Sequence, residues 1–197
     1  MEKKLEKIKQ QVIECTKCEL SQTRNNSVAG KGNFKADVIF VGEAPGKNED
    51  LKGEPFIGIA GKKLSIALES AGITREEVYI TNIVKCRPPK NRVPTPMERE
   101  TCQNYLKKEI EIIEPKIICV LGNTAFSSLL DGKEIIKFRG KIVRKNNQLY
   151  FLTIHPAATI YNQKLINVLK KDVKKLFKLI EEIKDGKEIK INIEYTS

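Results

Sequence analysis

The sequence lacks several features that would assign a chain quickly to a class of protein. No apolar run approaches the roughly 20 residues of a membrane-spanning helix, and no internal repeat or low-complexity linker interrupts the 197 residues. The first residues, MEKKLEKIKQQVIE, are amphipathic and mixed in charge, unlike a secretory signal. With 40% hydrophobic residues, we expect one folded domain over residues 1–197, cytoplasmic and without a membrane partner.

Two common nucleotide-binding motifs are also absent. The segment VGEAPGKNEDLKGEPFIGIAG is rich in glycine, which lets backbone N–H groups approach a ligand closely. It contains neither G-K-[ST] nor G-x-G-x-x-G, so the sequence gives little support to a nucleotide cofactor. Phe56 in this segment is either a core residue or a flat surface on which a base stacks.

Positive charge is in clear excess. There are 36 Lys and Arg residues against 25 Asp and Glu, which gives a net charge of +11. One interpretation is a polyanionic partner such as a nucleic acid. The other is a solvated, Lys-rich surface of the kind that heat-adapted proteins have.

Four short, nearly continuous apolar runs predict buried strands, as in a parallel sheet covered on both faces. They are DVIFVG (37–42), VYITNI (78–83), KIICVLG (116–122) and LYFLTI (149–154). Helices are expected between and around them, at 61–72, 95–113, 123–130 and 162–184. We therefore predict an α/β fold, a three-layer α/β/α arrangement with a central, mainly parallel four-stranded sheet.

Local signals place several of the element ends. Gly72 is a plausible C-cap of the helix at 61–72. Thr95 and Glu98 form the pattern of a capping box at the start of the next helix. Asn146-Asn147 predicts a hairpin over 141–154. The last dozen residues alternate Ile with polar residues, which indicates an edge strand or a loosely attached tail.

Unusual polar or glycine-rich segments follow the predicted strands. GEAPG follows the first, Asn82 ends the second, LGN ends the third, and HPAA, with the only histidine of the chain (His155), follows the fourth. In an open parallel sheet ligands bind outside the carboxyl ends of the strands. The four segments are therefore expected to converge on one crevice.

The five cysteines divide into four and one. Cys15 and Cys18 form a C-x2-C pair, Cys86 and Cys102 flank a loop and the start of a helix, and Cys119 lies in a strand as core filler. Four thiolates suit either tetrahedral zinc or a [4Fe–4S] cluster. The wide second pair differs from a zinc ribbon and favours the cluster.

The loop RPPKNRVPTP lies between Cys86 and Cys102, and a bound metal group would fix it at both ends. Proline stiffens the loop further, so its cations would meet phosphates with little loss of chain entropy. We expect Arg87, Lys90 and Arg92 to bind the phosphates of a nucleic acid, if the excess charge reflects such a partner.

Together, GEAPGKNED, GEPFIG, YITNIVKCRPP, LGNTA and HPAA resemble the uracil-DNA glycosylase superfamily. They are most similar to family 4, the thermostable iron–sulfur uracil-DNA glycosylases, and the resemblance runs from Cys15 to about residue 180. It implies a [4Fe–4S] cluster on Cys15, Cys18, Cys86 and Cys102. It also implies removal of uracil from single- and double-stranded DNA, by a chain that we expect to act as a monomer.

The resemblance also implies how the motif residues would bind a uracil that is flipped out of its strand. Phe56 would stack on uracil, Asn82 would pair with N3–H and O4, and His155 would donate to O2. Backbone groups of Glu43, Ala44 and Pro45 would line the opposite side of the base.

The chain departs from the G-Q-D-P-Y-H motif of the best-known branch. Ala44 stands at the position of the Asp and Gly46 at that of the Tyr, and family 4 shares the missing carboxylate. Glu43 and Asn91 are our candidates for positioning the attacking water. Glu49 would fill the space of the Tyr and exclude the methyl group of thymine. Tyr161 stands where many relatives have Arg.

We predict a monofunctional uracil-DNA glycosylase that leaves an abasic site. The alternatives are a relative with shifted base choice, such as hypoxanthine or mismatched thymine, and a non-catalytic, metal-stabilised DNA-binding module.

Overall fold

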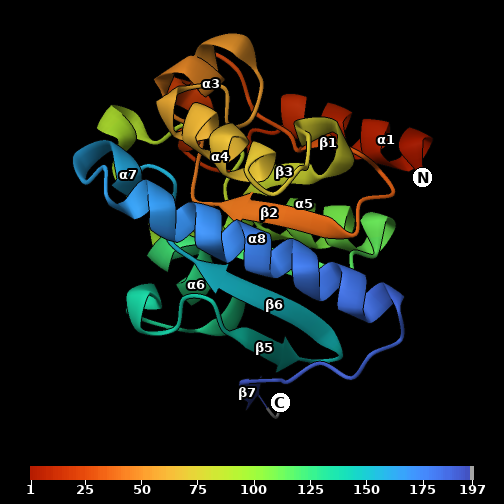
Figure 1. Ribbon diagram of the computed structural model, residues 1–197. Helices are drawn as coiled ribbons and strands as arrows, with labels where there is room; N and C mark the ends of the chain where they lie inside the picture. The colour runs from red at the N-terminus through yellow and green to blue at the C-terminus, as the bar shows by residue number, and fades with distance from the viewer. Residues whose placement is uncertain (196–197) are drawn as a thin grey trace.

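The fold is a seven-stranded sheet covered on both faces by helices, described for residues 1–195 by a computed structural model (Figure 1). The strand order is β1-β3-β2-β4-β6-β5-β7. The strands are β1 (Lys31–Gly32), β2 (Val38–Gly42), β3 (Tyr79–Asn82), β4 (Ile117–Leu121), β5 (Ile142–Lys145), β6 (Gln148–Thr153) and β7 (Ile193–Tyr195).

The four predicted strands form the parallel centre of this sheet, which confirms the predicted fold class. β2 pairs in parallel with β3 and with β4, and β4 pairs in parallel with β6. Every residue of β2 and β4 is buried, as expected for strands covered on both faces. The register places Gly42 beside Asn82, so the carboxyl ends of these strands lie at one edge.

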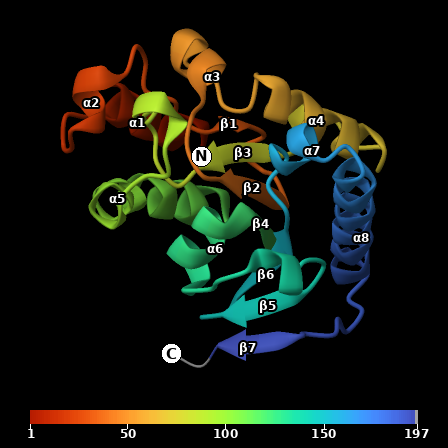
Figure 2. The same cartoon turned by 90° about the vertical axis from the view of Figure 1, so that its left-hand side faces the viewer.

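The helices form the two outer layers. Figure 2 shows α1, α5 and α6 on one face of the sheet and α4 and α8 on the other. Within residues 1–195, none of the helices combines the length and the apolar character needed to cross a membrane. Their bounds are α1 (Glu2–Ile13), α2 (Leu20–Thr23), α3 (Lys47–Lys52), α4 (Ile59–Glu69), α5 (Pro96–Ile113), α6 (Gly122–Leu130), α7 (Ala158–Tyr161) and α8 (Leu165–Lys184).

The predicted helix ends are largely confirmed. The N–H of Glu98 donates to Thr95 Oγ1 and the carboxylate of Glu98 accepts from the N–H of Thr95, which is the predicted capping box of α5. Gly72, at φ +75°, ends α4 in a Schellman turn, in which Ile73 N–H donates to the Leu68 carbonyl. The last predicted helix begins three residues later than expected, because the separate helix α7 and a turn precede it.

Three further strands extend the predicted four-stranded centre. β5 and β6 form the predicted hairpin, whose turn residues Asn146 and Asn147 both have positive φ (48° and 63°), a conformation that Asn tolerates. β7 pairs in parallel with β5, which confirms an edge strand for residues 193–195; residues 196 and 197 of the predicted tail lie outside the described residues. The two-residue β1 pairs antiparallel with β3.

Candidate active site

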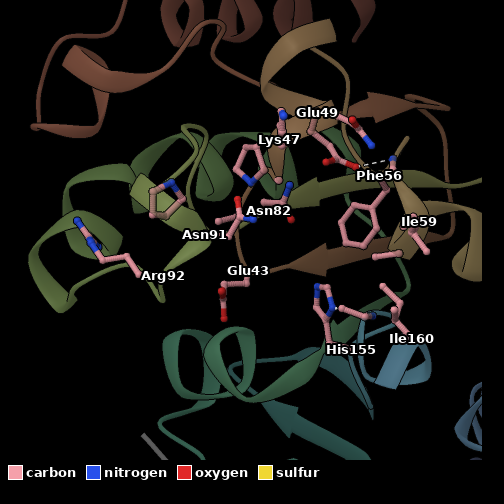
Figure 3. Close-up of a pocket in the computed structure, with 18 of the residues that line it drawn as sticks. Glu43, Lys47, Glu49, Phe56, Ile59, Asn82, Asn91, Arg92, His155 and Ile160 are labelled. Carbon is pink, nitrogen blue, oxygen red and sulfur yellow. Dashed lines mark hydrogen bonds between the residues drawn. The ribbon is translucent and has the colours of Figure 1, made fainter. Parts of the chain in front are cut away.

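A cavity of about 520 Å³ opens at the carboxyl edge of the parallel strands. Three of the four segments that were expected to converge line it, and its walls come from the loops after β2, β3 and β6 and from the connection between α3 and α4 (Figure 3). The fourth segment, LGN at the end of β4, does not line it, and the Asn123 side chain accepts instead from the N–H of Ile135. Nine of the predicted site residues line it: Glu43, Ala44, Pro45, Glu49, Phe56, Asn82, Asn91, Arg92 and His155. Tyr161 also lines it and is 91% exposed.

Asn82, the last residue of β3, places an unused hydrogen-bond acceptor in this cavity. The residue is buried, yet its Oδ1 has no hydrogen-bond partner among the described residues. A side chain on the neighbouring Gly42 would lie 2.6 Å from this oxygen and 2.4 Å from the Phe56 ring, so the packing requires glycine there. A buried acceptor without a partner costs about 1–3 kcal/mol, which points to a donor supplied by a ligand.

Phe56 forms one wall of the cavity in a strained backbone conformation. Its φ is +53°, which is uncommon for a residue with a side chain. A Cβ on Gly61 would lie 1.7 Å from the Phe56 carbonyl oxygen, so glycine in the first turn of α4 permits this close approach. The ring belongs to the core cluster beside α4, which confirms a core position, and it also lines the cavity. Strained residues of this kind cluster at functional sites.

His155 follows β6 and lies next to Phe56, with 5.8 Å between the ring centroids. Its Nδ1 accepts a hydrogen bond of 3.1 Å from the N–H of Ala157. In the neutral imidazole the proton is therefore on Nε2, which is a donor. Burial lowers the pKa of His155 to about 4, so the ring is neutral near pH 7.

The two predicted candidates for water positioning differ in their surroundings. The Glu43 carboxylate points toward α6 in Figure 3 and accepts a hydrogen bond from the Thr124 hydroxyl. Asn91 has φ +57°, and its Oδ1 accepts from Arg87 Nε at 2.7 Å. Its amide nitrogen makes no hydrogen bond within residues 1–195.

Glu49 occupies the space beside Gly46. One carboxylate oxygen accepts from the N–H of Gly58 at 2.7 Å. The other oxygen would lie 2.9 Å from a Cβ at residue 46. The Glu49 carboxylate therefore fills the region that a side chain at position 46 would enter.

The three predicted DNA-contacting cations are engaged to different degrees. The guanidinium of Arg92 makes two bonds, of 2.6 and 2.8 Å, to the Glu98 carboxylate. Arg87 uses its Nε for Asn91 and keeps its other donors. Lys90 is exposed and has no ion pair in the described part of the chain. Arg87 and Lys90 lie outside the cavity lining.

The four predicted metal ligands lie in one apolar cluster with α1 and α5. Cys86 and Cys102 are buried, Cys15 and Cys18 are partly buried against them, and none forms a disulfide. Cys119 is fully buried in β4, which confirms it as core filler. Among residues 1–195, no three His, Cys, Asp or Glu side chains are grouped so as to hold a single metal ion.

Backbone and side-chain donors point at two of these sulfurs. Arg24 donates to Cys86 Sγ at 3.0 Å, and the Lys85 N–H donates to Cys102 Sγ at 3.3 Å. Burial raises the pKa of the Cys102 thiol to about 12, and burial also raises the pKa of Cys86, with the nearby Cys18 and Cys15 adding to it. Donors that face sulfur stabilise thiolates and tune the clusters that they hold.

Sequence reasoning missed several residues that support the site. Arg24, Thr124 and Lys85 contact site residues in the fold, at sequence separations up to 81 residues. Glu109 acts one step further away, through its bond to Lys85. Thr124 lies in the motif LGNTA but was given no role, and no local pattern distinguished Arg24 or Glu109 from ordinary surface residues. The apolar context of Lys85, within NIVKC, was the one available signal.

Comparison with known proteins agrees with this geometry. The sequence model of the Uracil DNA glycosylase superfamily matches residues 29–181. A Type-4 uracil-DNA glycosylase of Archaeoglobus fulgidus is 45% identical over 184 residues, covering 89% of this chain and 92% of the relative. Those of Sulfurisphaera tokodaii and Thermotoga maritima are 47% and 42% identical, covering 89% and 88% of this chain and 84% and 93% of the relatives. The chain belongs to the uracil DNA glycosylase superfamily and, within it, to the family of the type-4 enzymes.

Proposed function

We propose that the chain is a monofunctional uracil-DNA glycosylase that hydrolyses the N-glycosidic bond of a flipped uracil in single- or double-stranded DNA. The unpartnered oxygen of Asn82, facing a cavity walled by Phe56 and His155, is the observation on which the proposal rests. Flipping costs a few kcal/mol in lost stacking. The Phe56 ring would recover part of this by stacking on the base.

Base selection would come from Asn82. Its Oδ1 accepts N3–H of uracil and its amide N–H donates to O4. Cytosine presents an acceptor and a donor in the reverse order, so at least one buried group would be unpaired, at a cost of roughly 1–3 kcal/mol.

Bond cleavage would be assisted by His155. Negative charge accumulates on O2 of uracil as the bond to C1′ breaks, and the Nε2–H of a neutral imidazole stabilises it. Backbone groups of Glu43, Ala44 and Pro45 line the other side of the base. We keep Glu43 and Asn91 as candidates for positioning the water, and the free amide nitrogen of Asn91 supports the second.

DNA would approach along the loop after Cys86. Arg87 and Lys90 keep free donors and are the main phosphate contacts that we propose. We expect a smaller contribution from Arg92, because Glu98 already binds its guanidinium.

The residues at the cysteine site fit a [4Fe–4S] cluster on Cys15, Cys18, Cys86 and Cys102. The support is a set of two buried and two partly buried thiols in one cluster, with N–H donors aimed at two of the sulfurs. A cluster binds one thiolate on each iron, so its ligands need not converge on a single point as zinc requires. Its role would be structural, holding the basic loop against the domain. Metal analysis of anaerobically purified protein separates iron from zinc.

The test is incubation of the protein with an oligonucleotide that has one uracil, followed by alkali. A glycosylase without lyase activity gives a single break only after alkali, and His155→Ala should remove the break while DNA affinity is retained. Oligonucleotides with hypoxanthine or mismatched thymine test a shifted base choice. Absence of any break at every temperature would instead indicate a DNA-binding module.

We expect the activity in the cytoplasm, and the unpaired cysteines are compatible with that.

A further inference from the structure

A fully buried ion pair lies directly behind the cavity. Lys85, in the turn after β3, and Glu109, on α5, are 1% and 0% exposed, and Nζ lies 2.6 Å from the carboxylate. Neither residue lines the cavity. The pair therefore needs an explanation other than contact with a substrate.

The Lys85 ammonium uses all of its donors inside the protein. It donates to Glu109 Oε2, to the Thr81 hydroxyl and, at 3.1 Å, to the backbone carbonyl of Asn82. Glu109 also accepts from Thr81 and, through its other oxygen, from the N–H of Gly30. The network is thus fully hydrogen-bonded, as a buried charge requires.

Stability alone is a poor reason for such a pair. Well-packed apolar residues of similar volume are often as stabilising as a buried ion pair, because desolvation of both charges offsets their attraction. Buried ionic groups are best explained where they fix one conformation. The conformation fixed here is that of the peptide of Asn82.

Asn82 needs this contact because the sheet ends beside it. β1 pairs only with Tyr79 and Ile80, so no strand reaches Asn82 on that side. Lys85 supplies the donor that a neighbouring strand would otherwise provide. The N–H of Lys85 meanwhile bonds to Cys102 Sγ, so one residue connects the cysteine site to the base-reading amide.

We propose that Lys85 is a positioning residue that fixes the Asn82 peptide, and thereby aims the Asn82 side chain at uracil. This rests on the proposed function of the cavity. The N–H of this peptide, on Ile83, donates to the Gly42 carbonyl at 2.9 Å, so the peptide is held from both sides. Without Lys85 it keeps only the bond to Gly42, and the Asn82 amide can tilt away from N3–H and O4. The loss of Lys85 should therefore weaken binding of the base and not binding of DNA.

The experiment compares variants of the complete, iron-loaded protein by binding of free uracil. Lys85→Met/Glu109→Gln removes both charges, which avoids a lone buried charge, and also removes the donor to Asn82. Thr81→Val is the matched control, because it takes a hydroxyl from the same network without touching the Asn82 carbonyl. Thermal unfolding, iron content and affinity for DNA with an abasic-site analogue are measured for each variant.

We expect the double variant to bind free uracil at least tenfold more weakly, with abasic-DNA affinity and iron content within about threefold of wild type. Thr81→Val should be less stable but should bind uracil within about threefold. Three results would each overturn the proposal. The double variant could bind uracil with an affinity near that of wild type, Thr81→Val could lose as much uracil affinity as the double variant, or uracil affinity could fall only in samples that have lost iron.

If the double variant does not fold, Lys85→Gln/Glu109→Gln, which keeps an uncharged donor, is compared with Lys85→Leu/Glu109→Gln, so that neither protein has a lone buried charge. Tighter uracil binding by the variant with Gln at position 85 supports the proposal, and equal binding contradicts it. If the wild-type protein neither binds nor releases uracil, the proposed function fails and this inference falls with it. A functional wild type with unaffected variants refutes only the role of Lys85.

Discussion

At the scale of single residues, the site is defined by groups that the protein leaves unused. Asn82 Oδ1 has no partner among the described residues, and the Nε2 side of His155 is available because Nδ1 is already bonded to Ala157. An acceptor and a donor around a flat ring match the edge of one pyrimidine. Among the described residues, the buried side-chain atoms without a partner are Asn82 Oδ1 and Arg99 Nε, and of these two residues only Asn82 lines the cavity.

The first prediction concerns the pH dependence that His155 imposes. Its folded pKa of about 4 lies below the ordinary 6.5, so between these values the unfolded chain binds more protons. The contribution of His155 to the free energy of unfolding is therefore fully present above pH 6.5 and is lost as the pH falls toward 4. We expect kcat/KM for uracil release to show no ionisation near pH 6.5 and to decline near pH 4. An inflection at 6.5 in the pH–rate profile would contradict a neutral donor.

A second residue-scale prediction concerns Glu49, whose carboxylate fills the space beside Gly46. Glu49→Ala opens this space, and we expect detectable thymine release from a G·T mismatch, or slower uracil release in a folded protein. Glu49→Gln keeps the volume and should still exclude thymine. Thymine and uracil release both unchanged from wild type in Glu49→Ala would refute the role.

At the scale of elements, sequence patterns predicted the parts whose determinants are local. The four central strands follow from short apolar runs, and the start of α5 follows from Thr95 and Glu98. Much of the cavity lining was also anticipated, because the carboxyl ends of parallel strands lie at one edge of a sheet, although LGN after β4 does not line the cavity. The Lys85–Glu109 pair and the Arg24–Cys86 contact depend on packing between distant segments, which periodicity does not encode.

Arg24 connects the end of α1 to Cys86, so its replacement should weaken the binding of a metal group at the cysteine site. Its guanidinium bonds both Cys86 Sγ and the carbonyl of Ile13 at the end of α1, each at 3.0 Å. Arg24→Met keeps much of the volume without the donors, so we expect the iron of the proposed cluster to be released several-fold faster in the presence of a chelator. Arg144→Met, which alters an exposed ion pair with Glu194, is the control. Equal release rates in both variants would argue against a role for Arg24.

At the scale of the whole molecule, the net charge of +11 favours binding to DNA. The contribution of each cation depends on whether an ion pair within the protein already engages it. Removing one phosphate-binding cation should reduce the slope of log K against log salt by roughly 0.9 on duplex DNA. Replacing Arg87 and Lys90 together with Gln is expected to lower the slope by about 2. Arg92→Gln should change it less because of Glu98, and Lys184→Gln, at the Asp37 end of β2, should leave it unchanged. The slopes are measured by DNA titrations at several salt concentrations. If all these variants changed the slope equally, the result would contradict a localised DNA-binding surface.

The two outermost strands of the sheet have a consequence for how copies of the chain meet. β1 has two residues and β7, as described, has three, and the longer strands lie between them. A second molecule would find at most a few free backbone groups at either margin, too short a template for strand addition and for growth into filaments. Pairing of two copies strand to strand is therefore disfavoured at both margins of the described sheet.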